Sequence, residues 1–295
     1  MFIGFPALSQ KQKSHFIGIQ TDNDAYLMTG QDRYYTNGLM LTYSKPLHVK
    51  EESNDLLTFQ LGHQLFNGKK LYNHLDFNWD RPSTGRFFVN AGFQRLYQNE
   101  WLWNVKTEIG VVGDAGKGKE IQRFIHNIFG MYEVESWNAE LKSAIGLDVE
   151  AKILKSFWRS ASNRFELSAA GGARAGMNFA NLSAQLAFRA GKLAHYRRSN
   201  FVGNGGFFSD EAEYYFFYMP GYRYQFYNAS IQGSLFARKA DERYHILPHL
   251  LTQKVGFAYS KGKFTIEAAV LFNTREGREV QKNHQYGSIK GGVRF

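Results

Sequence analysis

Two clusters of oxygen-bearing side chains lie close together near the start of the sequence. The first is Asp22-Asn23-Asp24, and the second runs from Asp32 through Thr36 to Gly38. A short connection separates them, which predicts a hairpin that brings both clusters to one end of two paired strands. Carboxylates, carboxamides and a hydroxyl crowded in this way suit a hard cation such as calcium. A polar loop built from Asx turns is the alternative interpretation.

A helix is expected between residues 113 and 137, where the chain loses the strand-like pattern that it has elsewhere. Apolar residues recur at helical spacing in this stretch. Asp114 is suited to cap the start of the helix, and Gly130 to end it. The apolar residues are Ile121, Phe124, Ile125 and Ile128.

His126 lies on this helix, and Gln122 lies one turn earlier on the same side. A neutral imidazole can take a proton from water during ester hydrolysis, while a cation stabilises the oxyanion. Asn23, Asp24 and Thr36 are the residues that could supply or hold that cation. Together they predict metal-assisted ester hydrolysis without a covalent intermediate, with Gln122 contacting the substrate. A histidine beside an apolar stripe can equally be structural.

Other routes to hydrolysis find little support in the sequence. The G-x-S-x-G motif of a nucleophile elbow does not occur. Of the nine histidines only His245 and His249 stand four residues apart, with Pro248 between them, and there is no cysteine, so a zinc site finds little support as well. A triad that joins His126 to a distant serine is possible, but nothing singles out a particular serine.

A basic loop from residue 67 to residue 85 could bind anionic groups of a substrate. Lys69, Lys70, Arg81 and Arg86 flank it, and we expect Lys69, Lys70 and Arg81 to contact substrate phosphates or anionic sugars. The alternatives are a solvated basic loop, or an ion pair within Asp80-Arg81-Pro82 that closes the loop.

Most of the remaining chain alternates between apolar and polar residues with a period of two, which predicts β-strands. In one such segment Trp103 and Val105 alternate with Lys106 and Glu108, as expected when one face meets lipid and the other a polar lumen. Twelve such segments can be counted along the chain. The sequence therefore predicts an all-β fold, a twelve-stranded antiparallel transmembrane β-barrel with one short α-helix in an extracellular loop.

Composition agrees with a membrane barrel better than with a soluble β-sandwich. Aromatic content is 16% although the mean hydropathy is −0.43, and no apolar run reaches the length of a transmembrane helix. In a sandwich, the outward Trp and Phe residues would leave large apolar patches in water. The net charge of +10 suits phosphorylated lipid headgroups, and we expect no nucleic-acid partner.

One domain is expected, preceded by a short leader. Residues 1–10 resemble the tail of a secretory signal whose start is missing, with a disordered arm as the alternative. Residues 11–295 then form a single barrel domain, which we expect to be a monomer. An even strand count puts both termini on the periplasmic side and the helix outside. The long connection over residues 197–210 joins the eighth strand to the ninth, and such even-to-odd connections are expected on the periplasmic side as well.

Several short motifs, in the same order and at similar spacing, resemble those of the outer-membrane lipid A 3'-O-deacylases of Gram-negative bacteria. The agreement covers most of the first 140 residues, and beyond it only the strand pattern and the terminal Phe agree. Tyr132 stands where some family members carry a glutamate, and Glu133 follows one residue later. The motifs are Asn23-Asp24, residues 32–38, Asp80-Arg81-Pro82, residues 110–113 and residues 122–126.

The resemblance implies calcium-dependent removal of the 3'-linked acyloxyacyl group from lipid A in the bacterial outer membrane. It also implies an active site between the barrel wall and the loop helix. By position, His126 resembles the general base, and Thr36 an active-site hydroxyl. Asn23 and Asp24 resemble the residues of the calcium and oxyanion site, and Lys69 or Lys70 a substrate-contacting lysine. Two other functions stay open: a non-catalytic barrel that binds lipopolysaccharide or is structural, and a narrow pore.

Overall fold

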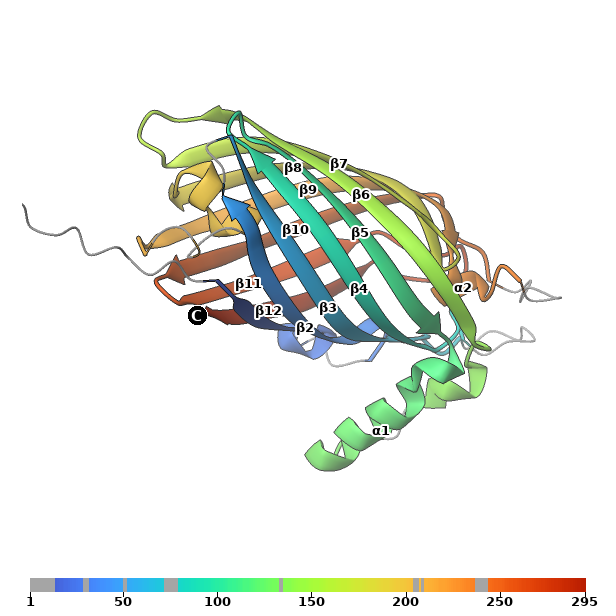
Figure 1. Cartoon of the computed structure of the whole chain (residues 1–295). Coiled ribbons are helices and arrows are strands. Elements are labelled where there is room, and N and C mark those ends of the chain that lie inside the picture. Colours follow the sequence, from blue (N-terminus) through green and yellow to red (C-terminus); the bar gives the residue numbers. More distant parts are fainter. Residues whose placement is uncertain are drawn as a thin grey trace, which may run out of the picture.

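The computed structural model describes residues 14–28, 32–49, 52–71, 79–132, 135–203, 207, 210–236 and 244–295. Within these ranges twelve antiparallel strands close into a barrel, each paired with its neighbours in sequence, and β1 pairs with β12 (Figure 1). The predicted barrel and strand count are confirmed. The expected leader, residues 1–10, lies outside the described residues.

The strand bounds are β1 (Phe16–Asn23), β2 (Tyr34–Val49), β3 (Ser53–Asn67), β4 (Thr84–Tyr97), β5 (Trp101–Val112), β6 (Ala144–Arg159), β7 (Phe165–Gly176), β8 (Phe179–Lys192), β9 (Glu213–Asn228), β10 (His249–Lys261), β11 (Phe264–Asn273) and β12 (His284–Arg294). The helical elements are η1 (Asp24–Leu27), η2 (Asp114–Gly116), α1 (Gly118–Phe129), η3 (Glu135–Ala139), η4 (Tyr196–Arg198), η5 (Asn200–Val202) and α2 (Ala229–Gln232). No helix in the described part of the chain is long and apolar enough to cross a membrane.

Strand alternation sorts the side chains between the outside and the inside of the barrel. On β1, Ile17 and Ile19 point outward and are 54% and 51% exposed, whereas Asp22 is buried and accepts a hydrogen bond from the Tyr35 hydroxyl. Outward apolar residues meet lipid in a barrel of this class. The period of two in the sequence thus decides which side chains face the membrane.

Charged residues that alternate inward meet across the barrel interior. Arg174 lies 2.6 Å from Glu108 and 2.7 Å from Asp148, and Arg189 lies 2.6 Å from Glu166. Lys106 pairs with Glu150 at 2.9 Å. These contacts confirm the predicted split between lumen and lipid, because each of these charges finds an opposite charge on another strand.

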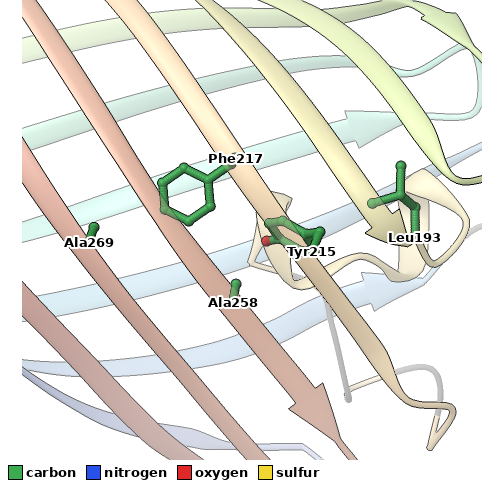
Figure 2. Packing of buried hydrophobic residues seen from close by; sticks show 5 residues of the cluster. All are labelled: Leu193, Tyr215, Phe217, Ala258 and Ala269. Carbon is green, nitrogen blue, oxygen red and sulfur yellow. The ribbon is translucent and has the colours of Figure 1, made fainter.

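The end of the barrel that holds both chain termini, here called the terminal end, also holds the β8–β9 connection. This segment folds back inside the wall (Figure 1), where Tyr196 and Val202 pack against Leu96 and Leu102. Figure 2 shows the neighbouring cluster, in which Leu193 lies beside side chains from β9, β10 and β11. The connection thus lies at the end that holds the termini, as strand parity requires, and its periplasmic location stays a prediction. Its inward packing accounts for its length.

The opposite end, here called the loop end, carries α1, which leans away from the strands (Figure 1). Long loops are typical of the extracellular side of such barrels, so we assign the loop end to the outside. Gly130 ends α1 in the left-handed conformation, as predicted. The expected cap was wrong, because Lys117 occupies the N-cap position and Asp114 instead belongs to η2.

Candidate active site on the outer wall

The end of β1 positions the first polar cluster. Period-two alternation continues from Ile17 to Asn23, so Asn23 lies on the outward face, and it pairs with Asn37 of β2 and Gly287 of β12. The strand stops there and η1 begins at Asp24, so Asp24 need not follow the alternation. Asn23 Oδ1 accepts a hydrogen bond from the Ala25 amide at 2.7 Å and thereby caps η1. This strand end is what lets two consecutive polar residues share one site.

Asp24 is a buried carboxyl, and its Oδ2 accepts a hydrogen bond from the Arg33 amide at 3.2 Å. Burial, together with the charge of Asp32, raises the pKa of Asp24 to about 7 against the lowering effect of the Arg33 amide. A buried carboxyl whose ionisation is disfavoured in this way would be stabilised by a cation beside it. The oxygen donors present therefore fit a hard cation such as calcium.

The full coordination shell is not made of acidic side chains. Among the described residues, no group of three or more His, Cys, Asp or Glu is arranged to hold a metal. Calcium takes six to eight oxygens and accepts carboxamide, backbone and water ligands, so Asp24 and Asn23 would provide only part of a set. Thr36 is buried at a register shift of β2 between Tyr35 and Asn37, and Asn37 is the residue opposite Asn23.

His126 points from α1 toward the second polar cluster and is only 6% exposed. Its Nδ1 lies 2.6 Å from the Tyr132 carbonyl oxygen. A carbonyl only accepts, so Nδ1 carries the proton, and Nε2 is left as the basic atom of the neutral ring. Nε2 lies 3.2 Å from Asp32 Oδ2. A carboxylate there would stabilise the imidazolium once the ring has taken up a proton.

Asp32 and Tyr132 were not assigned to the site from the sequence. The Tyr132 hydroxyl donates to Asp32 Oδ2 at 2.9 Å, and the Asp32 amide donates back to that hydroxyl at 3.3 Å. Burial and then the Asp32 charge raise the pKa of Tyr132 to about 12, so the phenol stays a donor at neutral pH. Asp32 stood within the second cluster, whereas Tyr132 was noted only as a departure from the family pattern, at a position where some members carry a glutamate.

Gln122 fastens α1 to the barrel. Its Oε1 accepts hydrogen bonds from Asn67 Nδ2 at 3.1 Å and Trp137 Nε1 at 2.7 Å. Its Nε2 is buried and has no hydrogen-bond partner among the described residues. Gln122 and His126 both line a pocket of about 210 Å³ beside the helix. Gln122 thus holds the histidine in place and leaves one donor available in that pocket.

The predicted basic contacts separate into two groups. Lys70 lies at the surface, 3.0 Å from Glu135, and Lys69 is its neighbour. Arg81 is only 1% exposed, because its guanidinium turns into the barrel mouth, 3.6 Å from Glu276 and 4.8 Å above the Phe66 ring. That position gives Arg81 a structural set of partners, so it is left out of the site proposed below.

Comparisons with known proteins agree with this architecture. A family model described as "Outer membrane protein LpxR" matches residues 1–295. LpxR from Salmonella typhimurium superposes with a TM-score of 0.76 at 18% identity, covering 95% of this chain and 100% of that one. At this identity the structural likeness shows the shared fold.

More distant barrels also align. The COG4313 outer membrane channel from Pseudomonas putida F1 gives a TM-score of 0.51 at 10% identity, with 100% of both chains covered. The translocator domain of the autotransporter NalP from Neisseria meningitidis gives 0.50 at 10% identity, covering 98% of this chain and 91% of that one. A search of curated protein sequences gave no significant match.

Proposed function

The chain belongs to the LpxR family of outer membrane proteins and resides in the bacterial outer membrane, and we propose that it hydrolyses the 3'-linked acyloxyacyl ester of lipid A in a calcium-dependent reaction. The observation that carries this proposal is the set of contacts that His126 makes from helix α1. His126 has its proton fixed on Nδ1 by the Tyr132 carbonyl, and its basic Nε2 lies beside Asp32. That arrangement suits a general base that works at the membrane surface.

The residues divide the work of ester hydrolysis among them. Water attacks the ester carbonyl while Nε2 of His126 takes its proton, and Asp32 stabilises the imidazolium that results. The imidazolium then returns the proton to the leaving alkoxide, so the products are a carboxylic acid and an alcohol. The Tyr132 hydroxyl fixes the orientation of Asp32.

The negative charge that develops on the carbonyl oxygen needs compensation. A calcium ion held by Asp24 and Asn23 would supply that positive charge. Two contacts link Asp24 to the histidine. The Asp24 carboxyl accepts a hydrogen bond from the Arg33 amide, and Asp32, which precedes Arg33 in the chain, contacts His126. Thr36 and Gln122 offer a hydroxyl and an amide close to these groups. Lys69 and Lys70 are proposed to contact substrate phosphates.

Mass spectrometry of lipid A tests this proposal. Cells that express the protein should lose the 3'-linked acyloxyacyl group, and cells that express His126→Asn should keep it. The same comparison with purified protein, in EDTA and after calcium is restored, tests the cation. Unchanged lipid A in the presence of a folded wild-type barrel would favour a lipopolysaccharide-binding role instead.

A further inference from the structure

A groove of about 440 Å³ crosses the outer wall next to the candidate site, over β12, β11, β10 and β9. Apart from one serine and a tyrosine ring edge, its lining is apolar or glycine. The lining includes Tyr26, Phe216, Phe257, Ala268, Val270 and Ile289. Three strand spacings of about 4.8 Å give it a span of roughly 14 Å across the wall. It is thus an open depression in the wall, and it faces lipid.

The groove exists because a small side chain stands among large ones. Ala268 points outward on β11 and pairs with Phe257 on one side and Ile289 on the other. The Phe257 ring lies 5.1 Å from the Phe216 ring, and this aromatic pair forms the far wall. Because these walls belong to paired strands, the depression is fixed in the fold rather than opened by side-chain motion.

The near wall of the groove belongs to the candidate site. Tyr26, in η1, packs over Gly287, where an added Cβ would lie 2.7 Å from the Tyr26 Cβ. The Tyr26 hydroxyl is 2.9 Å from the hydroxyl of Thr21, which holds the ring against the wall. Gly287 is also the β12 partner of Asn23. The groove therefore starts beside Asn23, one of the two residues proposed to hold the calcium ion.

The geometry points to this groove as the binding site for one acyl chain of the lipid that is hydrolysed, an inference that rests on the proposed function. In a bilayer the surrounding tails are as apolar as the wall, so an apolar surface alone gives no preference. Close van der Waals packing does give a preference for one position. A chain lying on Ala268 between Phe257 and Ile289 gains contacts that a flat wall does not offer. Its polar end would then lie at Tyr26, beside Asn23.

Binding is tested without turnover by a spin label beside the groove. The chain has no cysteine, so Ile266→Cys in the His126→Asn background gives a single labelling site, at the next outward residue of β11 beyond Ala268, where the label leaves the groove open. Ala173→Cys, an exposed outward alanine of β7, four strands away, is the control. In phosphatidylcholine nanodiscs, adding lipid A should immobilise the label at position 266 and leave the label at position 173 unchanged. Equal responses at both positions, or none, would overturn the inference.

Catalysis gives the second test. Ala268→Phe fills the groove and should lower kcat/KM for long-chain lipid A about tenfold, mostly through KM, whereas Ala173→Phe should not. Lipid A with chains too short to reach Ala268 should be cleaved by Ala268→Phe at the wild-type rate, which shows that the variant is folded. Equal losses for long and short chains would contradict the groove.

The two tests separate failure of the groove from failure of the proposed function. If wild-type protein does not cleave lipid A but the label at position 266 responds to it, the proposed hydrolysis is wrong and the acyl groove stands. If cleavage occurs but neither the label nor Ala268→Phe shows an effect, hydrolysis stands and the groove is ordinary lipid-facing wall.

Discussion

At the terminal end of the barrel two buried carboxylates pair with two guanidinium groups, whereas at the loop end two carboxyls lie near each other beside a histidine. Arg189 contacts Glu166 at 2.6 Å and Glu213 at 3.5 Å, and Arg159 also pairs with Glu166. Asp32, in contrast, raises the pKa of Asp24. The first arrangement balances its charge internally and so fixes a loop. The second gains stability when a cation or a proton arrives, which is the property of a binding site.

The largest expected effect is at the loop end. His126→Ala should lower kcat by about 10²–10⁴, because no other group takes the proton from water. Raising the calcium concentration should not restore activity, since a cation supplies no base. Steady-state hydrolysis of lipid A measures the effect, and heat-modifiable migration in gels checks that the barrel is folded. Normal turnover by this variant would remove His126 from the mechanism.

Breaking the balanced end should affect stability rather than activity. Arg189→Ala leaves Glu213 buried without its cation, while Glu166 keeps Arg159, and this should cost about 3–5 kcal/mol of unfolding free energy. Urea titration in lipid vesicles measures this loss, with kcat per folded molecule unchanged. The exposed pair Lys117–Glu120 is the control, since Lys117→Ala should have little effect on the unfolding free energy. A large loss of kcat in Arg189→Ala would mean that the two ends are coupled.

The raised pKa of Asp24 predicts a pH dependence of calcium binding. Below about pH 7 the cation-free carboxyl keeps its proton, which calcium must displace. The apparent calcium affinity should therefore fall about tenfold for each pH unit below 7 and level off above it. The stability of the cation-free fold changes in the opposite direction. As pH rises from 3.8 to about 7, the buried carboxyl of Asp24 becomes charged and the unfolding free energy falls. Calorimetric titration of calcium at several pH values, with Asp24→Asn as control, checks the dependence. A flat profile in wild-type protein would exclude Asp24 as a ligand.

The smallest expected effect concerns the lysines. If Lys69 and Lys70 contact substrate phosphates, replacing both by alanine should raise KM about three- to tenfold and change kcat less. Lys261 and Lys263 lie at the β10–β11 turn of the terminal end, and replacing them should leave KM unchanged. An unchanged KM after the Lys69 and Lys70 replacements would remove that pair from the site.

The strands were predictable because each alternates with a period of two that a lipid face and a polar lumen impose. Strict alternation would put Asn23 and Asp24 on opposite faces, which requires a bulge or a strand end at this point, and β1 ends at Asn23. The inward fold of the β8–β9 connection was not predictable, because loop length does not say where a loop packs. Arg81 shows the same limit, since a positive charge does not reveal whether its guanidinium will face solvent or Glu276.

Site contacts between distant residues were harder to predict. Asp32 and Tyr132 lie 100 positions apart in sequence, and only the docking of α1 brings them together. The helix start was mispredicted because the left-handed conformation of Lys117 has no signature in its side chain. Local patterns thus gave the elements and several candidate residues, whereas the hydrogen bonds that define His126 depend on how two loops meet.

Asn23 lies on the outward face of β1, and this placement determines how a substrate is supplied. A lipid that reaches it arrives by lateral diffusion within one leaflet and never needs to leave the membrane. The quantity that sets occupancy is then the mole fraction of that lipid around the barrel, not its concentration in bulk water. Diluting the substrate with inert lipid at constant total amount should slow the reaction, whereas diluting the vesicles with buffer should not. Water, the other reactant, comes from the opposite side of the same boundary, so the protein works where the two phases meet.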